Sequence, residues 1–168
     1  MLETDEIRNR IAELYASAGT SANEVPLTIQ ALELISFAAN YVAAAGLLQT
    51  APQHWLPMLQ LTGQSVELAL KACLAASNVA PSRGHDLLDL YAQAQSRGYA
   101  LEASKYAAVV HLHHFYYQDL ATNTKFKSRY PATQSERLGG AVPPHPTFSA
   151  IVSSLAEQAN KRLGSNVA

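Results

Sequence analysis

The chain of 168 residues has little cysteine and almost no net charge. Cys73 is the single cysteine, so no intramolecular disulfide can form, and a reducing compartment is the simplest setting. Twelve Lys and Arg against thirteen Asp and Glu give a formal net charge of −1, which excludes a global attraction to nucleic acid or anionic membranes. The first six residues carry three carboxylates, unlike the basic start of a signal peptide. We therefore expect a cytoplasmic protein with Cys73 in its core.

The sequence also lacks the strict apolar–polar alternation of β-strands. Its apolar residues recur instead at spacings of three and four, which is typical of amphipathic helices. The expected helices span residues 3–18, 27–48, 52–78, 85–97, 102–120 and 147–163. A chain of this length, 48% apolar, can bury one core but is short for two domains. We predict one all-α domain over residues 1–168, an antiparallel up-and-down bundle of four main helices with one or two flanking helices.

The stretch 25–48 is long and apolar enough to raise the question of a membrane span. It is rich in Ala, however, and it contains Gln30, Ser36 and Asn40. Its apolar residues alternate at spacings of three and four, which gives a helix one broad apolar face. The pattern predicts a soluble helix with a buried face and no membrane partner.

Positive charge gathers in the last quarter of the chain. Residues 1–124 hold six Lys and Arg against eleven Asp and Glu, a net of −5, whereas residues 125–168 hold six against two, a net of +4. The segment 125–130 alternates Lys125, Lys127 and Arg129 with aromatic residues that include Tyr130. Cations and aromatic rings in alternation suit phosphate contacts and base stacking, although aromatic anchors of a solvated loop would look the same.

Three short motifs stand out along the helices. Glu67 and Lys71 are four residues apart, in the favourable order for an ion pair on one helical face. The run Gly84-His85-Asp86-Leu87 opens the next helix, where a carboxylate can cap backbone N–H groups. The run Arg129-Tyr130-Pro131 follows the expected helix 102–120. Taken singly, an exposed ion pair, a helix cap and a loop are the simpler explanations of these residues.

In this order and spacing the three motifs resemble the HEPN superfamily over about residues 27–135. The resemblance implies an antiparallel four-helix bundle that is commonly dimeric. It also implies a setting in bacterial toxin–antitoxin systems, nucleotidyltransferase partners or RNA processing. A homodimer is therefore expected, with RNA, a nucleotide or a partner protein as the ligand.

Catalytic members of that superfamily are similar to one another in an Arg followed after four to six residues by His. No Arg of this chain meets that spacing, because His145 follows Arg137 one residue too late. We therefore assign no catalytic residue and expect a binding protein without ribonuclease activity. The candidate binding residues are Lys125, Lys127, Arg129, Tyr130, His85 and Lys71.

Two alternatives remain open, and neither involves a cofactor or a metal. One is a noncanonical, metal-independent RNase or toxin that uses His85 or the histidines of 111–114 with Arg129. The other is a pure oligomerisation module, built from the apolar faces of 27–48 and 101–120. His111 and His114 are three residues apart, but no Cys or carboxylate at ligand spacing completes a zinc site, so none is predicted.

Overall fold

A computed structural model describes residues 9, 11–13, 16, 25–49, 54–117 and 144–165. Throughout these residues the regular structure is helical and there is no strand, so the predicted all-α fold is confirmed. The helices are α2 (Leu27–Leu48), α3 (Trp55–Ala76), α4 (Leu87–Gln95), α5 (Ala103–Tyr116) and α7 (His145–Ser165). Residues 9, 11–13 and 16, within the predicted 3–18 helix, are also helical.

The helix limits follow local chemistry. α2 begins directly after Pro26, whose fixed φ suits the position before a first helical turn. Asp86 caps α4, because its Oδ1 accepts hydrogen bonds from the backbone N–H groups of Leu88 and Asp89, both at 3.0 Å. After α4 the chain turns at Gly98, which has φ of +90°, a conformation that glycine adopts without strain.

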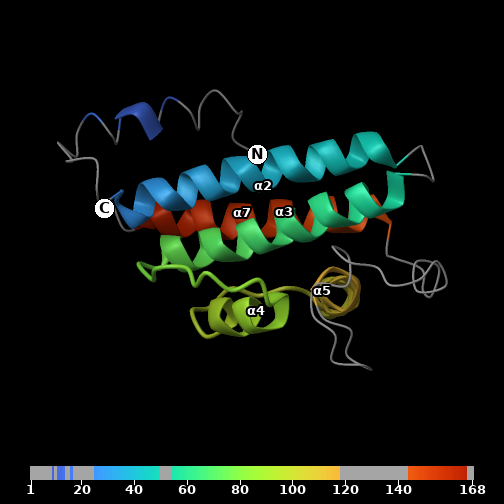
Figure 1. Cartoon of the computed structure of the whole chain (residues 1–168). Coiled ribbons are helices and arrows are strands. Elements are labelled where there is room, and N and C mark those ends of the chain that lie inside the picture. The colour runs from blue at the N-terminus through green and yellow to red at the C-terminus, as the bar shows by residue number, and fades with distance from the viewer. Residues whose placement is uncertain are drawn as a thin grey trace.

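α3 is the central helix of the described structure. Figure 1 shows α2, α3 and α7 side by side, while α4 and α5 lie on the other side of α3. α2 and α3 are antiparallel, α7 runs in the direction of α3, and α5 is seen end on. The strict up-and-down order of four main helices is therefore not confirmed, because α5 crosses the long helices instead of continuing the bundle.

The apolar core forms where α3 meets its neighbours. Leu70 of α3, Leu112 of α5 and Leu155 of α7 are all fully buried there. Cys73 is also fully buried, with its Sγ 3.6 Å from the Leu155 carbonyl oxygen. Burial raises the pKa of the Cys73 thiol to about 12, so the reactive thiolate is suppressed. The expected core role of this cysteine is thus confirmed.

α2 is long and apolar enough, by length and composition alone, to cross a membrane, with a mean hydropathy of 1.6 in its most apolar window. Core helices of soluble proteins pass the same test. In this fold α2 packs on α3 and α7, and it buries Ile29, Leu32, Ile35 and Val42 together with three alanines. α2 therefore buries one apolar face, as the sequence pattern predicted, and 33% of its most apolar window is buried in the fold.

Candidate functional site

A buried carboxylate organises the most polar part of the interior. Glu67 lies in the middle of α3 and is only 4% exposed. Side chains from three different elements reach its two oxygens: Lys71 from α3, His85 from the turn before α4, and Tyr116 from the end of α5. We call these four residues the Glu67 hub. A buried charge is tolerated only when it is paired and hydrogen-bonded, and the hub meets that requirement.

Lys71 supplies the compensating positive charge. Its Nζ lies 2.7 Å from Oε1 of Glu67, one helical turn away on the same face of α3. The Lys71 side chain is 13% exposed, so this pair is shielded from solvent far more than an ordinary surface ion pair. The two residues that the sequence placed on one helical face thus form an internal ion pair.

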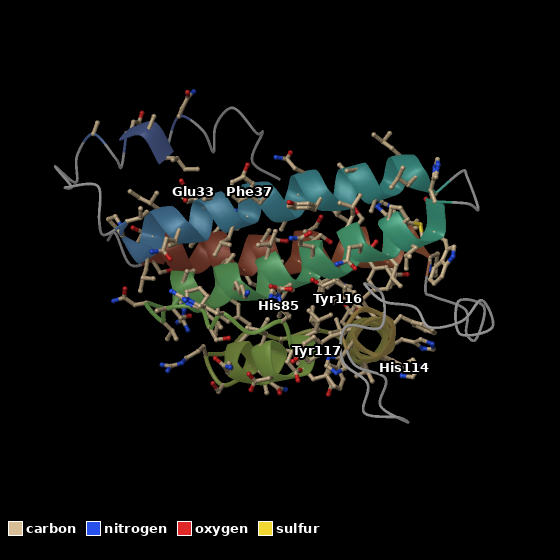
Figure 2. All side chains as sticks on the ribbon, viewed as in Figure 1. Glu33, Phe37, His85, His114, Tyr116 and Tyr117 are labelled. Atoms are coloured by element: carbon tan, nitrogen blue, oxygen red, sulfur yellow. The ribbon has the colours of Figure 1, made fainter. Side chains whose placement is uncertain are left out.

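His85 connects the hub to the surface. Its Nδ1 lies 3.0 Å from Oε1 and 3.1 Å from Oε2 of Glu67, so the Nδ1–H group donates a hydrogen bond to the carboxylate. The His85 side chain is 37% exposed, against 13% for Lys71 and 6% for Glu67. The Asp86 cap fixes the start of α4 and therefore the backbone position of His85. Figure 2 shows His85 and Tyr116 on the side of α3 that faces α4 and α5.

Tyr116 completes the hub through a very close helix approach. Its hydroxyl donates to Oε2 of Glu67 at 2.9 Å, and it is 3% exposed. Its ring lies directly against Gly63, one turn before Glu67 on α3. A Cβ atom at Gly63 would stand 2.1 Å from a ring carbon of Tyr116, so only glycine allows this approach.

His113 lies beneath the α4 cap. It is 1% exposed, and its Nδ1 is 3.6 Å from Oδ1 of Asp86, beyond hydrogen-bond length. Among the described residues this nitrogen has no hydrogen-bond partner. Desolvation by burial lowers the pKa of His113, the Asp86 carboxylate opposes that shift, and His114 adds to it. His113 is therefore held as a neutral imidazole at neutral pH.

The structure brings together two of the six predicted binding residues, Lys71 and His85. The other four, in the segment 125–130, lie outside the described residues, as does Arg137. His145 begins α7, and its Nε2 donates to the Val42 carbonyl at 2.7 Å while its ring packs against Gly46. That contact joins α7 to α2, which is a structural role for His145.

Sequence reasoning missed Tyr116 and Gly63. The spacing of Gly63, Glu67 and Lys71 at four-residue steps could have indicated a small residue beside a polar face of α3. Nothing local to Tyr116 marks it as the donor that completes the site, because its contact spans 49 positions of the chain.

The chemistry available to the hub follows from its charges. Glu67 and Lys71 neutralise each other, so the inner part of the hub has no excess charge to attract an anion. His85 is the hub residue that combines an exposed edge with a ring orientation fixed by a carboxylate. Among the described residues, no three His, Cys, Asp or Glu side chains come close enough to hold a metal ion. The arrangement is suited to presenting an oriented imidazole at the surface.

Comparisons with known proteins agree with this architecture. The family model described as HEPN domain matches residues 31–140, which include α3, α4, α5 and the whole Glu67 hub. No curated protein and no solved structure shows significant similarity to the chain. On the family match, which covers well over half of its length, the chain belongs to the HEPN domain family.

Proposed function

We propose that this HEPN domain binds single-stranded RNA without cleaving it, through His85 and the basic segment 125–130. The observation that carries the proposal is the Glu67 hub, which holds the imidazole of His85 at the surface in one orientation. An oriented ring that can hydrogen-bond or stack is a typical contact to RNA, while cations supply phosphate contacts.

The end of α5 supports the involvement of the basic segment. Tyr116, the last residue of α5, contacts the same carboxylate as His85, and Tyr117 is the C-cap, so α5 ends in the hub. Lys125 follows Tyr117 by eight positions, a stretch of chain that can span at most about 26–29 Å. The length of the chain therefore allows the basic segment to reach the hub.

A titration of the protein with labelled single-stranded RNA at two salt concentrations tests this proposal. Three phosphate contacts predict that affinity falls about 15- to 20-fold between about 50 and 200 mM salt. Replacing Lys125, Lys127 and Arg129 by Gln should remove most of that salt dependence. His85→Gln should weaken binding and change the salt dependence less than the triple replacement does.

Lys105→Gln provides a matched control, because Lys105 is a cation on α5 whose Nζ already lies 3.6 Å from a Glu102 oxygen. Its loss should change RNA affinity by less than about twofold. Affinity that is independent of salt, or that survives the triple replacement, would reject the proposed site.

RNA should remain intact during incubation with the protein. Cleavage that disappears in Arg137→Ala or His145→Ala would reject the non-catalytic assignment.

The carboxylate–imidazole contact favours a second candidate function, a metal-independent RNase with His85 as the general base. In Ser-His-Asp triads, a carboxylate likewise holds one imidazole nitrogen of the histidine, and the other nitrogen acts as the general base. Incubation of RNA with a metal chelator would then yield cleavage products that are absent with His85→Ala and strongly reduced with Glu67→Gln. Intact RNA with the unmodified protein would eliminate this candidate.

A homodimer is part of the proposal. Three large apolar side chains are exposed in the described surface: Leu47 at 81%, Phe37 at 52% and Tyr106 at 41%. Leu47 and Phe37 lie on α2 and Tyr106 lies on α5, the two helices whose wide apolar faces the sequence indicated. Light scattering should give twice the chain mass, and Phe37→Asp should reduce it towards the monomer. A monomer at high concentration would count against this part.

A further inference from the structure

A second polar feature lies at the C-terminal end of α7 and shares no residue with the Glu67 hub. An open pocket of about 360 Å³ lies between the loop that joins α4 to α5 and the last turns of α7. Arg97, Gly98 and Tyr99 line it from the loop, and Gln158, Lys161 and Arg162 line it from the helix. These two segments are about sixty positions apart in the sequence, so only the fold brings their side chains together.

The pocket walls are fixed by hydrogen bonds between the loop and the helix. The Gln158 amide makes a paired contact with the backbone of Ala100: its Oε1 accepts from the N–H at 3.0 Å, and its Nε2 donates to the carbonyl at 3.0 Å. Arg162 donates from Nη2 to the carbonyl of Arg97. The positive φ of Gly98 makes the turn between these two anchor points. The pocket is thus formed before any ligand arrives.

The charge of the pocket is unbalanced. Arg97, Lys161 and Arg162 contribute three cations, and none of the lining residues is acidic. Within the part of the chain that the structure describes, no carboxylate forms an ion pair with any of the three. Glu157 lies one turn before Lys161 on α7 and is not a lining residue. Three cations around one concave surface repel each other and focus a positive potential that attracts a multivalent anion. The partial negative charges at the C-terminal ends of α4 and α7 offset this potential only in part.

Tyr99 is the aromatic residue of the pocket, and its ring is not open to stacking with a base. Tyr99 is 4% exposed, and its hydroxyl is hydrogen-bonded to the Ser77 hydroxyl at 3.1 Å. The Arg162 guanidinium covers its ring, with Cζ 5.9 Å from the ring centroid. The ring therefore orients Arg162 and leaves no open face for a base. The guanidinium has five N–H donors, of which the Arg97 carbonyl needs only one.

We propose that this pocket binds a compact oligophosphate, either as free pyrophosphate or as the phosphate chain of a nucleotide. Bidentate donors from two arginines and a point charge from one lysine match the oxygens of two adjacent phosphate groups. The site is separate from the RNA edge at His85, and it does not depend on the proposed RNA binding.

Calorimetric titrations of the full chain with pyrophosphate, ATP and adenosine, in the absence of RNA, test the proposal. Pyrophosphate should bind and adenosine should not. ATP that binds as tightly as pyrophosphate identifies the phosphate chain as the whole ligand, whereas tighter binding of ATP identifies a nucleotide. Either of these two results supports an oligophosphate site.

The decisive variant is Arg97→Gln combined with Lys161→Gln, which removes two exposed cations and leaves the anchoring Arg162 in place. Its affinity for pyrophosphate should fall by about tenfold or more. Arg83→Gln removes an equally exposed cation from the turn before α4 and should change affinity by less than about twofold. Circular dichroism should show the same helicity for all three proteins. Failure of the unmodified protein to bind pyrophosphate, or equal binding by the double variant, would overturn the proposal.

Discussion

The Glu67 hub and the Arg97–Lys161–Arg162 pocket differ in how their charges are balanced. In the hub, a carboxylate is buried and a cation, an imidazole and a hydroxyl from this chain complete its coordination. In the pocket, three exposed cations gather without a counter-ion among the described residues. A buried charge must be balanced within the fold, because water cannot solvate it. Exposed charges can remain unpaired in the free protein, because water solvates them, and a bound ligand can then supply the opposite charge. Substitutions in the hub should therefore have the largest effects on the free energy of unfolding, and substitutions in the pocket should have the largest effects on ligand affinity.

The largest expected effect on stability is that of Glu67→Ala. Loss of the carboxylate leaves the shielded ammonium of Lys71 and the buried hydroxyl of Tyr116 without their shared acceptor. The free energy of unfolding, measured with urea, should fall by about 3 kcal/mol. Glu67→Gln keeps the shape and one acceptor oxygen, so it should cost about half as much. Equal and small losses for both variants would show that the hub is not a stabilising unit.

Gly63→Ala should follow with a loss of about 1–3 kcal/mol, because the new methyl group would overlap the Tyr116 ring. Gly164→Ala is its matched control, since a Cβ there meets nothing within 4 Å. That control should be neutral or stabilising by up to about 1 kcal/mol, as expected of Ala in a helix. If Gly63→Ala behaved like the control, Tyr116 would not pack against α3 as described.

Asp86→Ala should lower the free energy of unfolding by about 1 kcal/mol, because it removes the cap from α4 and loosens the position of His85. Asp86→Asn retains an oxygen for the cap and removes only the charge. The two variants separate the cap from the electrostatic effect on His113, whose pKa should drop further in both. Thermal unfolding and histidine NMR titrations give the two readouts.

Burial of His113 predicts a pH dependence of stability. Its pKa is lowered in the folded chain, so between that pKa and the ordinary value of about 6.5 the unfolded chain binds more protons. The free energy of unfolding should therefore be highest above about pH 6.5 and should decrease as pH falls below it. Urea titrations from about pH 8 to pH 5 measure this slope, which should become smaller in His113→Gln. A slope of the opposite sign would contradict a neutral, buried His113.

The smallest expected effect on stability belongs to the pocket. Arg97→Gln with Lys161→Gln should change the free energy of unfolding by less than about 0.5 kcal/mol, and any change should be favourable because like charges are removed. Together with a large loss of pyrophosphate affinity, that result would separate a binding site from a structural one. A destabilisation comparable to that of Glu67→Ala would instead place the pocket cations in the framework of the fold.

Several features of the fold and of the hub could be predicted from the sequence. Spacings of three and four gave the five described helices to within a few residues at their ends, and the Asp86 cap was expected from its place before Leu87. The pairing of Glu67 with Lys71 also followed, because both lie on one helix. The burial of that pair was not predicted, since an i,i+4 ion pair has the same sequence pattern whether it lies in solvent or in a core.

The sequence by itself determined the helices, their caps and the absence of the Arg-to-His spacing of HEPN ribonucleases, because these depend on residues only a few positions apart. Tertiary structure alone decided that α5 crosses α3, that Tyr116 lies on Gly63, and that the loop at Arg97 meets the end of α7. Contacts across 49 to 65 positions depend on how helices pack, and helix packing depends on side-chain shape and volume that no local periodicity specifies.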